Sequence, residues 1–377
     1  MCNGSKDIST LCLKFIFLKF LIALFFCPIL ISGQCNGSSI LCNKKYDDVA
    51  YLTTHNAFNS SEDNFSLPNQ NFNISNQLND GVRGLMIDVY DHSGVTSVYH
   101  GSTILGSEPL IDYLIDIDSF LVNNPNEVVT IILECYVIAD TIETLINQSG
   151  LDDFLYTHDP SSSWPTLQEM IDNNTRLVVF SDVDDASASQ QWYHYVWDYA
   201  VETHYSVHHQ KHFSCDFNRG DSINDLFIFN HFVTTPFGTG NHIVAVDVNA
   251  NPFFINRAQE CQLAQNKFPN FITVDFYDFG NTMDVVNTLN GVITNVDEFA
   301  ELSNDNIRLF PNPTKDIVTI EIDGFHNKAI VEIFDISGRL LMTTDSSTID
   351  IKGFAKGIYL FKVQYGEKIA ELKVEKE

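Results

Sequence analysis

The sequence predicts an α/β fold, a TIM-like (β/α)8 barrel that we expect to be irregular in its second half, followed by a small all-β sandwich domain. Two observations support this division. Short apolar runs typical of buried strands alternate with helical patterns over about 250 residues, as in parallel barrels. Beyond residue 300 the helical period stops and short alternating strands follow one another.

The first residues are typical of a secretory signal peptide. Lysines precede an apolar run over residues 20–31, and Ser32-Gly33 supplies small residues at its exit. A membrane anchor is the alternative, but the run is short for a spanning helix and contains Pro28. We therefore expect three parts: a cleaved signal peptide (1–33), a barrel domain (34–300) and a C-terminal domain (301–377).

The charge of the chain is strongly negative and sits mostly in the predicted barrel. The net charge is -28, and residues 34–300 carry 35 Asp and Glu against 8 Lys and Arg. Such a body repels nucleic acid and anionic membrane surfaces at long range, so we expect no nucleic-acid partner. A phosphate-bearing substrate would need a local cation or a metal ion to offset this field.

Five cysteines follow the predicted signal peptide, and export permits disulfides. Cys35 and Cys42 bracket a short turn and are able to pair locally. Cys215 and Cys261 are able to close a longer loop. Cys135 lies in an apolar strand, which favours a buried free thiol. The sequence alone does not fix these pairings.

Individual elements follow from the same patterns. Strands are expected at 47–58, 82–90, 95–99, 128–134, 176–180, 226–231 and 271–276, and in the C-terminal part at 317–322, 329–334, 340–343 and 357–363. Helices are expected at 109–124, at 141–156 with a break at Gly150, from 164 to 170, at 255–267 and at 282–289. We interpret residues 59–79 as an irregular loop and 181–224 as a long region of weak periodicity.

Several predicted strands end in a polar residue that is able to take part in chemistry. His55 and Asn56 end the first strand, Asp88 lies near the end of the second, His100 follows the third and Glu134 ends the fourth. In a parallel barrel the carboxyl ends of the strands form the functional face. We therefore expect these side chains to meet there.

The stretch 49–137 resembles the catalytic X region of phosphatidylinositol-specific phospholipase C, most of all the secreted members that contain only this domain. The matching motifs are Leu52-Thr-Thr-His55-Asn56, Gly81-Val-Arg-Gly-Leu-Met-Ile-Asp88-Val-Tyr-Asp91 and Val129-Thr-Ile-Ile-Leu-Glu134. Residues 257–277 also resemble the last strand of that family. The resemblance implies a hydrolase that cleaves phospholipid phosphodiesters, with peripheral contact to a membrane.

Residues 306–377 resemble the C-terminal sorting domain of the type IX secretion system. The matching motifs are Phe310-Pro311-Asn312-Pro313, Ile333-Phe-Asp-Ile-Ser-Gly-Arg339 and Gly357-Ile358-Tyr359. This resemblance implies the type IX secretion machinery as a partner. It also implies that the protein is secreted or held at the cell surface.

The first resemblance implies that His55 is the base that deprotonates the inositol 2-hydroxyl and that His100 is the acid that protonates the leaving oxygen. An imidazole suits either role because its ordinary pKa is about 6.5. Asp275 ends a late strand, where it would orient His55 as a third catalytic residue. A structural role for each histidine, and a loop cap for Asp275, are the alternatives.

Oxygen ligands from Asn56, Asp88 and Glu134 suit Ca²⁺. The calcium-dependent branch of the family has a carboxylate where this chain has Met86, so we expect a weakened site. The calcium-independent branch has an arginine where this chain has Asp88. A polar layer without metal is the alternative, and Arg219 or Lys211 would then supply the positive charge.

Three functions remain open at this point. The favoured one is a secreted phosphoric diester hydrolase acting on phosphatidylinositol-type lipids. A phosphodiesterase for another head group, such as sphingomyelin or a glycerophosphodiester, is the second. The third is a catalytically silent surface-binding protein, which Met86 favours and the two histidines disfavour.

Overall fold

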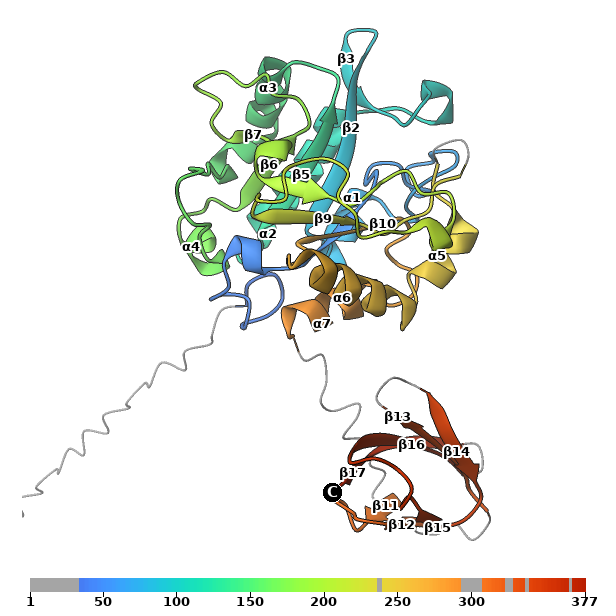
Figure 1. Ribbon diagram of the computed structural model, residues 1–377. Coiled ribbons are helices and arrows are strands. Elements are labelled where there is room, and N and C mark those ends of the chain that lie inside the picture. Colours follow the sequence, from blue (N-terminus) through green and yellow to red (C-terminus); the bar gives the residue numbers. More distant parts are fainter. Residues whose placement is uncertain (1–33, 236–238, 293–306, 323–327, 336–338, 366–367) are drawn as a thin grey trace, which may run out of the picture.

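The computed structural model describes residues 34–235, 239–292, 307–322, 328–335, 339–365 and 368–377 (Figure 1). The predicted signal peptide and the predicted boundary near residue 300 lie outside these ranges. No helix among the described residues is long and apolar enough to cross a membrane.

Eight parallel strands form the curled sheet of the first part, which is the predicted TIM-like barrel. Their order is β7-β6-β5-β2-β1-β10-β9-β8. The strands are β1 (Tyr51–Thr54), β2 (Gly84–His92), β5 (Val129–Cys135), β6 (Leu177–Ser181), β7 (Tyr193–Tyr195), β8 (Ala200–Glu202), β9 (Leu226–Asn230) and β10 (Phe271–Val274). Within the described residues no ladder joins β7 to β8, so the barrel is open in its second half, where irregularity was expected.

A hairpin extends β2 beyond the barrel. The strand β3 (Val95–Val98) pairs antiparallel with β2, and β4 (Glu108–Pro109) pairs with β3. Figure 1 shows this hairpin projecting from the sheet. It therefore carries the segment that follows β3, including His100, to the carboxyl side of the strands.

The helices are α1 (Ile74–Asn79), α2 (Leu110–Asn123), α3 (Ala139–Ser149), α4 (Leu167–Asp172), α5 (His242–Val248), α6 (Phe253–Gln265) and α7 (Thr282–Asn290), with 3-10 turns η1 (Tyr46–Asp48), η2 (Thr103–Leu105), η3 (Leu151–Phe154), η4 (Val196–Asp198) and η5 (Gln210–His212). The predicted start of α4 at residue 164 was too early, because Thr166 caps this helix in a capping box with Glu169. The helices α1 and α5 were missed, since six and seven residues are too short to show a helical period.

The first strand is shorter than predicted, because residues 46–48 form η1 instead of strand. It packs very closely against β2. A Cβ atom at Gly84 would lie 2.3 Å from Oγ1 of Thr53, so only glycine fits at this crossing. This close approach holds the carboxyl end of β1 beside the first residues of β2, and the segment after β1 stays bonded to β2, since the N–H of Ala57 donates to the carbonyl of Met86.

Alternate residues of the strands face the inside of the barrel. Part of this interior is apolar and aromatic, with Tyr51, Phe180 and Phe271 fully buried. Met86 and Ile132 belong to the same cluster, and Asp88 and Glu134 lie two residues further along the same strands. The period of two therefore turns both carboxylates toward the inside at the carboxyl end.

Both cysteine pairs that the sequence suggested are disulfides. Cys35 bonds to Cys42, and Cys215 bonds to Cys261. Cys135 is a buried free thiol, as predicted.

The C-terminal part is all β, as predicted. One antiparallel sheet contains β11 (Ile307–Phe310), β12 (Ile317–Ile322) and β15 (Thr348–Asp350); the other contains β14 (Leu340–Thr344), β13 (Ile330–Asp335), β16 (Gly357–Tyr365) and β17 (Lys368–Lys376). Apolar side chains of both sheets, such as Val318, Ile333 and Phe361, form one core. The strands β11, β15 and β17 fall outside the strand ranges predicted from the sequence.

Candidate active site

His55 directly follows β1 and is fixed from two sides. Its Nδ1 lies 2.9 Å from Oδ1 of Asp275, which directly follows the neighbouring strand β10. Its ring stacks on Phe232, with 3.9 Å between the ring centres. Because a carboxylate only accepts hydrogen bonds, Nδ1 carries the proton and Nε2 is the basic nitrogen.

A second pair of histidine and carboxylate lies beside the first. Oδ2 of Asp88 in β2 lies 3.1 Å from Nδ1 of His100, which follows β3. Burial raises the pKa of the Asp88 carboxyl, the charge of Glu134 adds to this shift, and the hydrogen bond with His100 opposes it. The predicted strand-end residues therefore do come together.

Two asparagines join the pairs. Asn56 has a positive φ of 47°, which asparagine adopts more readily than most residues, and its Nδ2 lies 3.2 Å from Nδ1 of His100. The same Nδ2 lies 3.3 Å from Oδ1 of Asn69, whose own Nδ2 donates to Asp275. Asn69 was not predicted as a site residue, because it lies in an Asn-rich loop without helical or strand periodicity.

A pocket opens beside these residues, with about 570 Å³ of empty space including its mouth. Its lining includes His55, Met86, Asp88 and Glu134 on one side. The opposite side is built from the region of weak periodicity and contributes Trp197, Glu202, Tyr205 and Arg219.

Arg219 is the only Lys or Arg among the described residues that line this pocket. Its Nε donates to Oε1 of Glu202 at 2.5 Å, and its guanidinium lies over the rings of Trp197 and Tyr205, 4.3 and 4.6 Å from their centres. Burial alone would lower the pKa of this guanidinium, but the contact with Glu202 more than offsets it, so the pKa is raised. Arg219 is therefore a fixed positive charge in an acidic pocket.

Two of the three proposed calcium ligands, Asp88 and Glu134, lie side by side. Asp88 and Glu134 are partners in register on adjacent strands, and the pKa of Asp88 is raised in part by the charge of Glu134, a repulsion that a divalent cation would relieve. One oxygen of Glu134 accepts a hydrogen bond from Tyr136 at 2.6 Å, and Met86 contributes no ligand. Among the described residues no group of three or more His, Cys, Asp or Glu side chains is arranged to hold a metal. Asn56 would have to complete the set.

The pocket lining does not include Arg83, Lys211, Trp192 or Tyr193. Arg83 forms an ion pair with Glu127 at 2.7 Å, away from the pocket. Lys211 does not line the pocket. In the aromatic stretch, Trp192 and Tyr193 are buried core residues, whereas Trp197 faces the pocket.

Comparison with known proteins places this geometry in a family. The model of the PI-PLC X family matches residues 41–290. A PI-PLC X domain-containing protein of Arabidopsis thaliana is 30% identical over 293 residues, which cover 71% of this chain and 67% of that protein. An uncharacterized secreted protein of Arthroderma benhamiae is 27% identical over 285 residues, covering 70% of this chain and 64% of the relative.

Among solved structures, the phosphatidylinositol-specific phospholipase C from Listeria monocytogenes aligns with a TM-score of 0.47 at 15% identity, covering 67% of this chain and 96% of that one. The model of a secretion system C-terminal sorting domain matches residues 308–376, which points to export and a location at the cell surface. The family model covers well over half of the chain, and this chain belongs to the PI-PLC X family.

Proposed function

We propose that this protein is a secreted phosphodiesterase that cleaves phosphatidylinositol-type phospholipids. The observation that carries the proposal is the pair of histidines, each bonded to its own carboxylate: His55 and Asp88 line one pocket, and His100 contacts this Asp88. Two imidazoles in such positions supply a base and an acid, which is what the displacement of an alkoxide from phosphorus requires.

His55 acts as the base in this mechanism. Asp275 holds the proton on Nδ1, so Nε2 is free to take the proton of the inositol 2-hydroxyl as its oxygen attacks phosphorus. His100 gives a proton to the oxygen that leaves. The new P–O bond and the broken one yield a cyclic phosphodiester and diacylglycerol.

The phosphate also needs positive charge, because Asp88 and Glu134 repel it. Two unit charges about 4 Å apart interact by about 4 kcal/mol at an effective dielectric constant of 20. Arg219 supplies one positive charge from the far side of the pocket. We propose that Asn56, Asp88 and Glu134 would hold a Ca²⁺ ion, which would supply a second positive charge to the phosphate.

A second substrate class also deserves a test, since four carboxylates face this pocket: Asp88, Glu134, Asp182 and Glu202. An acidic lining favours a zwitterionic head group whose cation offsets the field, such as the phosphocholine of sphingomyelin.

A panel of head groups decides between these functions. The full chain is incubated with vesicles of phosphatidylinositol, phosphatidylcholine or sphingomyelin, and with glycerophosphodiesters, and release of the head group is measured with added Ca²⁺ or chelator. We expect the highest rate with phosphatidylinositol. A higher rate with a choline lipid favours the second class, and no cleavage of any substrate favours a silent surface-binding protein.

We further propose that the type IX secretion machinery exports the chain after signal-peptide cleavage. Mature protein from the native host should then begin near Gln34 and lack about 70–80 C-terminal residues, the size of a small β domain. Mass spectrometry measures both ends. An intact C-terminus on exported protein would contradict removal of the sorting domain.

A further inference from the structure

We infer that Asn69 is a positioning residue for catalysis, which holds the Asp275–His55 pair in its working geometry and links it to the second pair. The inference rests on the proposed function. It concerns a buried side chain that neither lines the pocket nor has a role in the mechanism above.

The carboxylate of Asp275 has few hydrogen-bond partners. Its Oδ1 lies 2.9 Å from both Nδ1 of His55 and Nδ2 of Asn69. Its Oδ2 is buried and has no hydrogen-bond partner among the described residues. Without Asn69 the carboxylate would keep a single partner, and that partner is the imidazole it must orient.

Asn69 is itself held by burial and by hydrogen bonds of its side chain and backbone. It is fully buried, and its Oδ1 accepts from Nδ2 of Asn59 at 2.7 Å. Its backbone carbonyl accepts from the N–H of Phe276, one residue after Asp275. The next side chain, Gln70, donates to the backbone carbonyls of both His55 and Val274. The loop is thus bonded to the exits of β1 and β10 together.

Asn69 also connects to His100 through the side chain of Asn56. Oδ1 of Asn69 lies 3.3 Å from Nδ2 of Asn56, and that same Nδ2 lies 3.2 Å from Nδ1 of His100. A continuous path of contacting side chains therefore runs from Asp275 through the two asparagines to His100; its last link is a contact and not a hydrogen bond, because Nδ1 of His100 donates to Asp88. Because base and acid must face the same phosphorus atom, one rigid support for both is a functional advantage.

Two substitutions separate positioning from packing. Asn69→Ala removes the amide. Asn69→Asp keeps the volume and the acceptor but loses the donor to Asp275, and its charge faces that carboxylate. We expect both variants to lower kcat by about 10- to 100-fold with KM within about twofold, because misplaced catalytic groups slow the chemical step without weakening binding.

Asn71→Ala is the matched control. Asn71 lies in the same loop, and its Nδ2 donates at 2.8 Å to Oδ2 of Asp278, a carboxylate that also follows β10 but is exposed. We expect its kcat within about twofold of the wild type. Melting temperatures of all variants check that the fold persists.

The NMR signal of the Nδ1 proton of His55 gives a readout that needs no activity. We expect a downfield resonance in the wild type and in Asn71→Ala, shifted or lost in both Asn69 variants. The inference fails if this resonance is unchanged in both Asn69 variants. It also fails if Asn69→Asp keeps the wild-type kcat, or if the variants change only KM. A wild-type protein that cleaves no phosphodiester but shows these NMR changes would overturn the proposed function and leave the positioning role standing.

Discussion

The two walls of the pocket are built in different ways. On one wall, His55, Asp88 and Glu134 lie in or directly after buried parallel strands of the sheet. On the other, Trp197, Tyr205 and Arg219 lie in turns and loops, and only Glu202 belongs to a strand, the three-residue β8. The strand wall carries the reactive groups, and the loop wall carries the positive charge.

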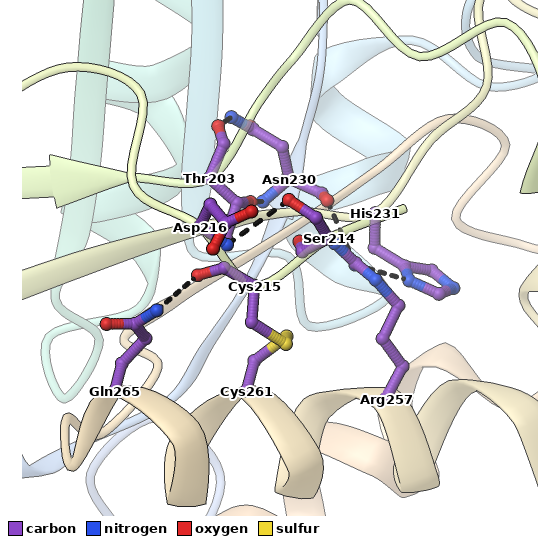
Figure 2. Close-up of a disulfide and its surroundings, with 9 residues drawn as sticks. All are labelled: Thr203, Ser214, Cys215, Asp216, Asn230, His231, Arg257, Cys261 and Gln265. Atoms are coloured by element: carbon purple, nitrogen blue, oxygen red, sulfur yellow. Dashed lines mark hydrogen bonds between the residues drawn. A yellow bond between two sulfur atoms is a disulfide. The ribbon is translucent and has the colours of Figure 1, made fainter. Parts of the chain in front are cut away.

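The segment that leads to Arg219 of the loop wall is held by contacts outside the pocket (Figure 2). Cys215 is bonded to Cys261 in α6, and Gln265 of the same helix donates to the carbonyl of Cys215 at 2.8 Å. Arg257 donates to the carbonyl of Ser214 at 3.1 Å and to the end of β9. Burial lowers the pKa of Arg257 to about 9, which still leaves it charged at neutral pH.

The barrel strands carry the groups of one wall and the loop around Asn69 holds His55 and Asp275 in place, whereas the other wall depends on a helix and a disulfide that hold a loop. Variants of the strand wall should therefore change the chemical step, and variants of the loop wall should change substrate binding.

The largest effect is expected from the two histidines. His55→Ala and His100→Ala should each lower kcat by at least about a hundredfold, because general acid–base catalysis contributes about 10²–10⁴-fold. Turnover of the head group measures this, with the exposed His209→Ala as the matched control. Rates within a few-fold of the wild type in both variants would remove the histidines from the mechanism.

Removal of the metal should have the next largest effect. Excess chelator should abolish most activity, and calorimetry should find Ca²⁺ binding in the micromolar-to-millimolar range that is typical of extracellular modules. Glu134→Gln should weaken this binding, since it removes one of two carboxylates. Full activity in chelator, with no metal found by elemental analysis, would leave Arg219 as the cation of this pocket.

Arg219→Gln tests the loop wall. We expect KM to rise about tenfold or more with a smaller change in kcat, since a hydrogen bond to a charged group contributes about 1.5–3 kcal/mol. Steady-state kinetics measures both constants. Arg339→Gln, in an exposed ion pair of the C-terminal part, is the control and should leave both unchanged. A fall in kcat at constant KM would assign Arg219 to the chemical step instead.

The smallest change in activity is expected from the disulfide behind the loop wall. Replacing Cys215 and Cys261 by Ser should raise KM a few-fold and destabilise the fold by about 4 kcal/mol, the loop-closure estimate for a separation of 46 residues. Replacing Cys35 and Cys42, seven residues apart, should cost about 2 kcal/mol and leave KM unchanged. Equal KM values in both double variants would show that the Cys215–Cys261 disulfide has no effect on substrate binding.

The same contrast explains what the sequence was able to predict. The strand wall followed from position, since a polar residue at the end of a buried apolar run in a parallel barrel faces the functional side. Asn69, Trp197 and Glu202 were not predicted as site residues, because short strands and irregular loops show no period in the sequence. Arg219 was named in advance only as a source of charge, and its contacts with Glu202, Trp197 and Tyr205 required the three-dimensional arrangement.

Phosphorus NMR of the products distinguishes attack by a hydroxyl of the substrate from direct hydrolysis by water. The full chain is mixed with phosphatidylinositol vesicles, and the reaction is followed over time beside His55→Ala. The account predicts that a cyclic phosphodiester appears with the wild type and not with the variant, because His55 deprotonates a hydroxyl of the substrate itself. A noncyclic phosphate monoester as the first product, or a cyclic product formed equally fast by His55→Ala, would contradict it.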